Sequence, residues 1–279
     1  MCEIKNLKEI QSLEYRILLR FTKLCEKYKL RYCLCGGTLL GAIRHEGFIP
    51  WDDDIDIIMP RPDFDELIKL YRNERLKNDL GDLEIASYDI DKNYIYPVTK
   101  IYDKTTKIDL NDHIISYDLG VWVDIFVLDG VSENKIINEI KFNYQKILTY
   151  LNVMCITRCG AERKNKLLTY GQLLLYPIFL LIRRIGHSKF VYLLEKNAKT
   201  YSFDKSKFVA VYAGRGGKKE IMPKKEFMEF KTAKFEDDEF YIPGNYQYYL
   251  KQLYGDYMKL PPENKRNSRH DIKVFKKEV

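Results

Sequence analysis

The stretch GFIPWDDDIDIIMP at residues 47–60 constrains the fold of this chain more than any other feature. Isoleucine is enriched in β-strands and acids are depleted, so the isoleucines predict a strand over residues 54–59 that nevertheless begins among carboxylates. Two carboxylates held side by side repel each other, and burial makes it costlier to ionise either one. The strand therefore needs a cation beside it. Four aspartates precede or enter it: Asp52, Asp53, Asp54 and Asp56.

Side-chain alternation places Asp54 and Asp56 on one face of this strand and the neighbouring isoleucines on the other. A divalent cation would relieve the repulsion between the two acids. Mg²⁺ takes hard oxygen ligands, often one or two carboxylates together with substrate phosphates. The pattern predicts a metal site for Mg²⁺, or for Mn²⁺, at Asp54 and Asp56. Asp52 and Asp53 have a second interpretation, as residues that cap a turn.

The segment GVWVDIFVLDG at residues 120–130 has the strongest strand pattern in the chain. Asp124 shares a face with Trp122 and Phe126, whereas the aliphatic residues between them share the opposite face. An acid in the middle of an apolar strand is costly unless something pairs with it. We expect Asp124 to be the third metal ligand, supplied by a neighbouring strand. A salt bridge to a basic side chain is the alternative.

Residues 32–37, YCLCGG, predict a short strand that runs into paired glycines and a brief helix or turn. Glycines let backbone N–H groups approach a phosphate closely, and the start of a helix favours its charge. Gly36, Gly37 and Thr38 are therefore candidate phosphate-binding residues, and a plain turn is the alternative. Three cations could neutralise a diphosphate, although each could also be a solvated surface charge: Arg44, Arg61 and Lys100.

Composition describes a soluble globular protein of 279 residues, with 46% hydrophobic and 31% charged residues. The net charge of +7 favours phosphate-bearing or polyanionic partners. We expect an α/β fold with a mixed sheet, flanking helices and a helical insertion. Its expected parts are a catalytic core at 1–131, a helical subdomain at 132–206 that could face a membrane or an acceptor, and a C-terminal part at 207–279 that completes the core.

Residues 167–185, LLTYGQLLLYPIFLLIRRI, form an apolar segment that Gln172 and Pro177 interrupt. Its apolar core is shorter than the roughly 20 residues of a membrane-spanning helix. A buried core helix and a helix lying in the membrane interface are both consistent with it, and basic residues flank it. The N-terminus lacks a signal-peptide pattern and the six cysteines do not resemble a disulfide framework. We therefore expect a reducing, cytoplasmic location, with membrane association as an option.

Three blocks of sequence resemble the LicD family of the nucleotidyltransferase superfamily, which is related to the fukutin-type transferases. They are GGTLLGAIRHEGFIPWDDDIDI, VWVDIFVLDG and YGDYMKLPPENKR, in the family's order. The resemblance implies a nucleotidyltransferase-like α/β fold. It also implies transfer of a phospho-alcohol, commonly phosphocholine, from a CDP-alcohol to a hydroxyl of a cell-surface glycan precursor, as in lipopolysaccharide or teichoic acid biosynthesis, with release of CMP.

Carried over residue by residue, the resemblance implies metal binding at Asp54 and Asp56, with Asp52 as a further candidate. Asp124 matches the position that binds metal or activates the attacking hydroxyl in the superfamily. The glycines and the threonine of the first block match a phosphate-binding turn. The end block matches as well. Arg266 at its end and His270 shortly after it are candidate substrate-binding residues, and a packing motif that closes the domain is the alternative.

These observations leave three functions to distinguish. The first is the phosphotransferase just described, with a CDP-alcohol donor, a glycan or lipid-linked glycan acceptor and no nucleic-acid partner. The second is a true nucleotidyltransferase that passes a nucleotide from a nucleoside triphosphate and releases pyrophosphate. The third is a nucleic-acid-binding module, suggested by the net charge and the 22 tyrosines. The acidic first block disfavours this third function because it would repel a phosphate backbone.

Overall fold

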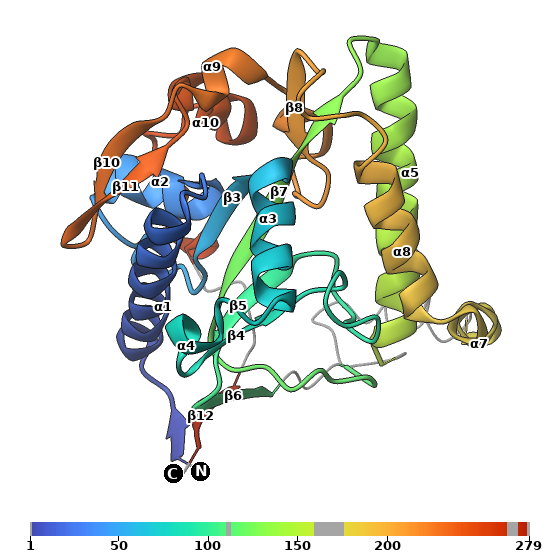
Figure 1. Ribbon diagram of the computed structural model, residues 1–279, viewed down its shortest axis with the longest axis horizontal. Helices are drawn as coiled ribbons and strands as arrows, with labels where there is room; N and C mark the ends of the chain where they lie inside the picture. Colours follow the sequence, from blue (N-terminus) through green and yellow to red (C-terminus); the bar gives the residue numbers. More distant parts are fainter. Residues whose placement is uncertain (1, 110–112, 159–175, 267–272, 278–279) are drawn as a thin grey trace.

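A seven-stranded mixed sheet forms the centre of the computed structural model, which describes residues 2–109, 113–158, 176–266 and 273–277 (Figure 1). The strands on its main path are, in spatial order, β2 (Cys33–Leu34), β3 (Asp56–Pro60), β7 (Trp122–Val131), β5 (Thr99–Asp103) and β4 (Leu83–Ala86). Two further strands extend the sheet beside β7, namely β8 (Phe208–Val211) and β9 (Met222–Pro223). The predicted α/β fold with a mixed sheet and flanking helices is confirmed.

Strand β7 holds the two halves of the sheet together. Strand β3 runs parallel to it along one edge. Along the other edge, the first half of β7 pairs with β5 and the second half pairs with β8, both antiparallel. Strand β8 thereby brings the C-terminal third of the chain into the same sheet as the N-terminal strands.

Two helices cover one face of the sheet because the strands present apolar side chains there. Both α1 (Leu7–Tyr28) and α3 (Arg61–Arg72) pack on β7 (Figure 1). Alternate residues of the central strands are at most 1% exposed: Ile57, Met59, Val123 and Ile125. The intervening residues, which include Asp56 and Asp124, face the opposite side of the sheet. The alternation predicted for residues 120–130 is therefore confirmed.

Helix α1 begins and ends at local signals in the sequence. The side chain of Asn6 caps its start by accepting a hydrogen bond of 3.0 Å from the N–H of Lys8. Lys29 takes the left-handed backbone conformation that ends it. The residues before this helix form strand β1 (Cys2–Ile4).

Strands from the two ends of the chain form a small second sheet. Its order is β1, β12 (Lys273–Lys276) and β6 (Thr106–Asp109), and Figure 1 shows the two termini side by side. Val274 in the middle strand is fully buried. A strand forms because β1 and β6 offer unpaired edges on both sides of it.

The remaining elements gather around the β3 end of the main sheet or on its flanks. They are α2 (Gly36–His45), α4 (Lys77–Leu80), the 3-10 helix η1 (Gly217–Glu220), α9 (Lys224–Met228), the hairpin of β10 (Lys231–Phe235) and β11 (Asp238–Ile242), α10 (Tyr246–Tyr254) and the 3-10 helix η2 (Glu263–Lys265). The hairpin contacts both α2 and β2. It thereby supports α2 at the end of the sheet where the acidic loop lies.

Helices α5 (Lys135–Ile156), α7 (Tyr176–Ile185) and α8 (His187–Ala198) stand together at one side of the sheet (Figure 1). Phe179 of α7 is buried, but Leu181 is 61% exposed and Ile185 is 56% exposed. The interpretation of this segment as a buried core helix is therefore wrong for α7, and residues 167–175 lie outside the described part of the chain. Within the described residues, no helix has both the length and the apolar content needed to cross a bilayer.

The packing of β3 against its helices makes a stability prediction. Ile57→Ala should lower the free energy of unfolding by about 2–5 kcal/mol, because Ile57 is fully buried and its truncation leaves a cavity. Ile147→Ala is the matched control, since Ile147 on α5 is 57% exposed and its truncation should change stability by about 0.5 kcal/mol or less. Urea denaturation followed by circular dichroism measures both. Equal losses would contradict the assigned faces.

Candidate active site

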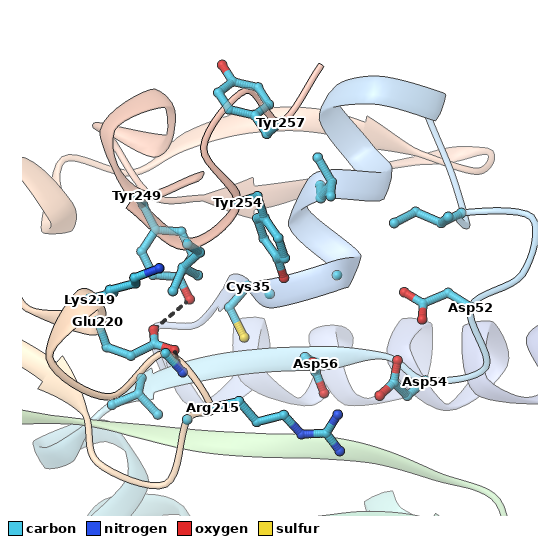
Figure 2. A pocket seen from close by; sticks show the side chains of 18 of the residues that line it. Cys35, Asp52, Asp54, Asp56, Arg215, Lys219, Glu220, Tyr249, Tyr254 and Tyr257 are labelled. Atoms are coloured by element: carbon cyan, nitrogen blue, oxygen red, sulfur yellow. Dashed lines mark hydrogen bonds between the residues drawn. The ribbon is translucent and has the colours of Figure 1, made fainter. Parts of the chain in front are cut away.

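A pocket of about 640 Å³ opens on the face of the sheet opposite α1 and α3 (Figure 2). Strands β3 and β7 contribute to its floor, the start of α2 forms one wall, and the segments around η1 and α10 form the other. A pocket of this size can hold a nucleotide-sized ligand. It collects residues from all three sequence blocks, which are far apart along the chain.

The register of β3 and β7 brings together acids that the sequence predicts to act as a set. Asp56 and Asp124 are direct partners in this parallel pair, so both carboxylates leave the same face of the sheet and line the pocket. Asp52 and Asp54 line it from the loop before β3. Figure 2 shows Asp54 next to Asp56, with Asp52 above them.

The tightest group of carboxylates lies slightly earlier in the chain than predicted. Asp52, Asp53 and Asp54 each offer an oxygen atom within 4.8 Å of the others. The side chain of Gln11 donates a hydrogen bond of 2.8 Å to the backbone carbonyl of Asp52, which fastens this loop to α1. Asp53 is only 5% exposed, whereas Asp52 and Asp54 reach the pocket. A cation held here from the pocket side would therefore draw first on Asp52 and Asp54.

Two glycines allow the first turn of α2 to lie directly against these acids. Gly36 has a φ of +54°, and a Cβ atom there would come within 3.0 Å of the Asp56 Oδ2 atom. A Cβ atom on Gly37 would lie 2.6 Å from the Asp52 Oδ2 atom, so a side chain would displace that carboxylate. The start of a ten-residue helix thus adjoins the acids, which suits a ligand that carries phosphate together with a cation.

Thr38 lies deeper than a phosphate-binding residue would. Its hydroxyl group is buried and accepts a hydrogen bond of 2.8 Å from the backbone N–H of Asp56. The bond joins α2 to the first residue of β3 and so positions Asp56. Phosphate binding by Thr38 stays a prediction, because the described lining of the pocket does not include it.

Lys100 lies beside Asp124, on the neighbouring strand β5. Strand β5 places the two residues opposite each other, and the Lys100 Nζ atom is 2.5 Å from the Asp124 Oδ1 atom. The indole N–H of Trp122 donates to the Asp124 Oδ2 atom at 3.3 Å, and the Lys100 Nζ atom lies 3.9 Å from the ring of Trp122. The salt bridge considered as the alternative for Asp124 is therefore present, while its carboxylate still lines the pocket. In this position Lys100 offsets the charge of Asp124, and its contact with a diphosphate stays a prediction.

Arg44 holds the end block against α2. It donates hydrogen bonds to the backbone carbonyls of Tyr257 at 2.9 Å and Lys259 at 3.5 Å. Arg44 also lines the pocket, as do Tyr254 and Tyr257 of the same block. The end block therefore closes the domain, which was the alternative interpretation of its sequence. It also supplies one wall of the pocket.

Arg266 continues this closure at the pocket rim. Its Nε atom donates to the backbone carbonyl of Pro261 at 2.8 Å, and its guanidinium group lies 5.6 Å from the ring centre of Trp51. Trp51 precedes the acidic loop and lines the pocket. Arg266 thus links the end block to the first block. The remaining candidate of this block, His270, lies outside the described residues.

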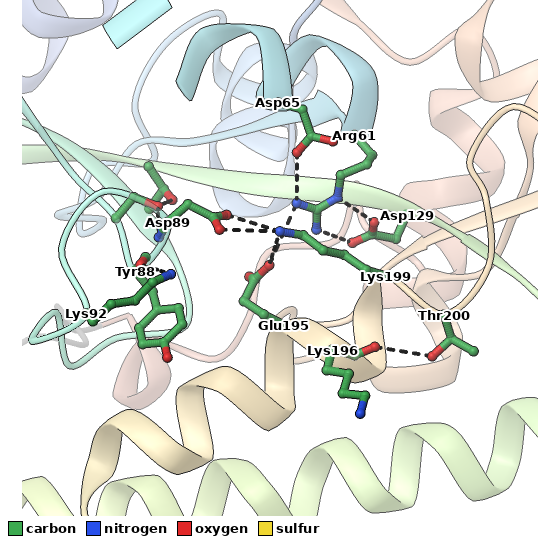
Figure 3. A network of polar contacts seen from close by, with 12 residues as sticks. Arg61, Asp65, Tyr88, Asp89, Lys92, Asp129, Glu195, Lys196, Lys199 and Thr200 are labelled. Carbon is green, nitrogen blue, oxygen red and sulfur yellow. Dashed lines mark hydrogen bonds and ion pairs between the residues drawn. The ribbon is translucent and has the colours of Figure 1, made fainter. Parts of the chain in front are cut away.

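Arg61 belongs to a separate ion network on the other side of the sheet (Figure 3). Its guanidinium group makes two hydrogen bonds to the carboxylate of Asp129, at 2.7 and 2.8 Å, and burial leaves it 8% exposed. Glu195 on α8 lies 3.7 Å from it and pairs with Lys199 at 3.2 Å. The network fastens α8 to α3 and β7. The charge of Arg61 is therefore paired with carboxylates of the protein, and its position needs no bound diphosphate to explain it.

One wall of the pocket carries residues that the sequence reasoning missed. The segment AGRGGKKE at residues 213–220 follows β8, and Arg215, Lys219 and Glu220 line the pocket. Figure 2 shows the side chain of Arg215 reaching along the floor toward the side of Asp54 and Asp56. A strand followed by glycines is the signal that could have found it, since that pattern was recognised at residues 32–37, and clustered cations strengthen it here.

Two carboxyl groups at the site, those of Asp56 and Glu14, have raised pKa values. Removal from water raises the pKa of Asp56 well above its ordinary value, and Asp54, Asp124 and Asp52 raise it further, whereas Lys100 opposes them. Glu14 on α1 is 4% exposed, and its pKa is also raised, first by burial and then by the acidic loop. A divalent cation bound nearby would favour the ionised form of these carboxyl groups. Carboxylate oxygens are also the ligands that Mg²⁺ prefers.

A parallel strand pair that carries opposed aspartates beside a glycine-started helix defines a nucleotidyltransferase-like α/β protein. The family model described as the LicD/FKTN/FKRP nucleotidyltransferase domain matches residues 29–146. Lipopolysaccharide cholinephosphotransferase LicD of Haemophilus influenzae is 33% identical over 271 residues, which cover 95% of this chain and 96% of that protein. The chain belongs to the LicD family.

Shorter matches fall on proteins without an assigned activity. Uncharacterized protein RP689 of Rickettsia prowazekii is 46% identical over 43 residues, covering 15% of this chain and 16% of that protein. Uncharacterized protein RT0683 of Rickettsia typhi is equally similar over the same length, covering 15% and 14%. These two matches show similarity over a short segment only. The family assignment rests on the full-length relative.

The raised pKa of Asp56 predicts a stability change in the metal-free protein. Asp56→Asn should be more stable than the wild type in EDTA at neutral pH, because ionising Asp56 costs stability once the pH exceeds its ordinary pKa of 3.8. The wild type should lose stability relative to the variant by up to about 1.4 kcal/mol per pH unit while this group titrates. Urea denaturation at several pH values measures the difference.

The exposed acid Asp82 provides the control. Asp82→Asn should change the free energy of unfolding by about 0.5 kcal/mol or less, because an exposed side chain makes few contacts. A constant difference between wild type and Asp56→Asn at every pH would contradict a raised pKa at Asp56.

Proposed function

We propose that this protein is a metal-dependent phosphotransferase that moves phosphocholine from CDP-choline to a hydroxyl group of a lipopolysaccharide-type glycan, with CMP as the other product. The observation that carries the proposal is the pairing of Asp56 with Asp124 beside the glycine-started helix α2. The full-length relative, which is named as a lipopolysaccharide cholinephosphotransferase, supports the choice of phospho-alcohol and acceptor.

The metal in this proposal is Mg²⁺ or Mn²⁺, with ligands from Asp52, Asp54, Asp56 and Asp124. When bound, it would neutralise phosphate charge and orient the phosphorus for attack. The protein's own contribution is to hold the carboxylates in place. Thr38 fixes the start of β3, and Lys100 and Trp122 fix the two oxygens of Asp124. These contacts support a set of acids whose positions are fixed before substrate binds.

Phosphoryl transfer depends mainly on positioning and on neutralising charge. The acceptor hydroxyl would attack the phosphorus next to choline, and the bond from that phosphorus to the oxygen shared with CMP would break. The proton of the hydroxyl would pass to a pocket carboxylate, and the charge that develops on CMP would be met by cations. Arg215 and Lys219 line the pocket on the side opposite α2 and could meet it there. The backbone N–H groups at the start of α2 could hold the same phosphates.

A true nucleotidyltransferase would use the same acids, and the two reactions differ in the phosphorus that is attacked. The proposed reaction releases CMP from a CDP-alcohol. The alternative consumes a nucleoside triphosphate and releases pyrophosphate. Detection of the released product therefore separates the two functions.

The proposed reaction predicts a donor and metal requirement. With Mg²⁺ and a lipopolysaccharide acceptor, wild-type protein should release CMP from CDP-choline, and EDTA should abolish the release. Asp56→Asn should lower kcat/KM at least about 10²-fold, because it removes a carboxylate from the charge-neutralising centre. Chromatographic assay of CMP measures the rate.

The control for this assay is Asp82→Asn, which should keep the wild-type rate because Asp82 is exposed. Pyrophosphate release from CTP without CMP release from CDP-choline would establish the nucleotidyltransferase alternative. Salt-sensitive oligonucleotide binding that persists in Asp56→Asn, without either product, would favour a nucleic-acid-binding module.

We further propose that α7 and the outer face of α5 lie on an anionic bilayer, which would bring the protein to a lipid-linked acceptor. The apolar side chains on α5 recur at helical spacing and are 57–71% exposed: Ile136, Ile140 and Ile147. Leu181 of α7 is equally exposed, and the exposed Arg184 in its last turn would contact anionic headgroups. An apolar face edged by cations suits a lipid surface.

Membrane docking predicts the effect of a single charge. Leu181→Glu should weaken binding to vesicles that contain anionic lipid by about 10-fold, because it places a carboxylate among headgroups of the same charge. Leu260→Glu is the matched control, since Leu260 is 45% exposed on the end block, away from these helices. Cosedimentation with vesicles measures binding. Equal sedimentation with and without anionic vesicles would contradict the docking.

A further inference from the structure

Glu220 is a buried carboxyl at the end of the pocket formed by η1 and α10, and neither the metal nor the attack on phosphorus uses it. The side chain is 6% exposed, yet it lines the pocket. It accepts hydrogen bonds of 3.2 Å from the backbone N–H of Gly216 and from the hydroxyl of Tyr249. Both donors are neutral. Within the described residues, no ion pair joins Glu220 to Arg215 or Lys219, although both cations line the same pocket.

The position of Glu220 is fixed by close packing. A Cβ atom on Gly214 or on Gly216 would come within 2.6 Å of its Oε1 atom, so the glycine-rich loop wraps tightly around the carboxyl. Burial raises its pKa to about 7, and the two hydrogen bonds oppose that rise. A carboxylate in such a setting is stabilised by a cation that enters from the pocket.

A second tyrosine of α10 lines the same pocket. Tyr254 at the end of α10 is 38% exposed, and Figure 2 shows its ring pointing down into the pocket toward Cys35. Tyr249, one turn earlier on α10, is 3% exposed and holds Glu220 through its hydroxyl. A pocket that is lined by both an aromatic face and a buried carboxylate can attract an organic cation.

Cys35 connects this corner to the acid centre. The pKa of its thiol is raised by burial first, and then by the nearby charges of Asp56 and Glu220 among others. Both carboxyl groups therefore lie within electrostatic reach of Cys35. A phosphate held at Asp56 would thus have the Glu220 corner as a neighbour.

We propose that Glu220 and Tyr254, with Tyr249 as the positioning residue, bind the quaternary ammonium group of the transferred phospho-alcohol. This inference rests on the proposed function, because it assigns part of the proposed donor to a place in the same pocket. A quaternary ammonium has no N–H to donate, so it is recognised by a carboxylate charge and by aromatic faces. A neutral alcohol such as glycerol would leave Glu220 without a cation, and the corner therefore selects against neutral donors.

Binding measured without turnover tests the subsite directly. Titration calorimetry in Mg²⁺ would compare phosphocholine with glycerol 3-phosphate, which has the same phosphate but no cation. Wild-type protein should bind phosphocholine more tightly. Glu220→Gln keeps the shape and the hydrogen bond from Gly216, and it should weaken phosphocholine binding by about 10- to 100-fold while leaving glycerol 3-phosphate binding within about 3-fold.

Tyr254 offers a matched pair of variants. Tyr254→Leu removes the aromatic face and should weaken phosphocholine binding by about 5- to 10-fold, whereas Tyr254→Phe keeps the face and should bind as the wild type does. Equal effects of Leu and Phe would show that the hydroxyl matters and the π face does not, which would overturn the role of Tyr254.

The outcomes separate this inference from the proposed reaction. Loss of both ligands in Glu220→Gln would show that Glu220 only shapes the loop, and an unchanged preference for phosphocholine would exclude it from the subsite. Either result overturns the inference even if CMP is released from CDP-choline. A Glu220-dependent preference for phosphocholine in a protein that releases no CMP would support the subsite and contradict the proposed reaction.

Discussion

The parallel pairing of β3 with β7 is the interaction on which the rest of the structure depends. It sets Asp56 opposite Asp124 on one face, and the same register turns Ile57 and Ile125 toward α1 and α3 on the other. A slip by one residue would bury the acids among the helices and expose the isoleucines. The hydrophobic core therefore enforces the position of the acids. Repulsion between carboxylates is tolerated here because burial of the opposite face stabilises the pairing.

Much of this could be predicted from the sequence because strand alternation is a local property. The acids of the first block and Asp124 of the second already revealed their shared face, and the paired glycines revealed the start of α2. The contribution of Arg215, Lys219 and Glu220 could not be predicted in the same way. It depends on the pairing of β8 with the second half of β7, across about 80 residues of intervening chain. The position of Lys100 depends likewise on the register of β5 against β7.

Three cations near the pocket are already engaged by groups of the protein. Lys100 is paired with Asp124 on the same face of the sheet, and Arg44 and Arg266 donate to backbone carbonyls of the end block. The raised pKa values of Asp56 and Glu220 show that neither carboxyl is fully compensated by its surroundings. The proposed ligand would supply the missing charges. Its divalent cation would meet Asp56, its phosphates would meet the pocket cations, and its organic cation would meet Glu220.

Closure of the pocket links its formation to the folding of the whole chain. The floor comes from β3 and β7, one wall from the loop after β8, and the last wall from the end block that Arg44 ties to α2. The chain then returns to β1 through β12, so its two ends are joined in one small sheet. Before the end block packs against α2, the aspartates of the pocket would be exposed to water and would bind a cation weakly. Packing of the C-terminal segment encloses the pocket and lowers its local dielectric constant. Electrostatic binding of both the cation and the phosphates is therefore stronger once that segment has packed.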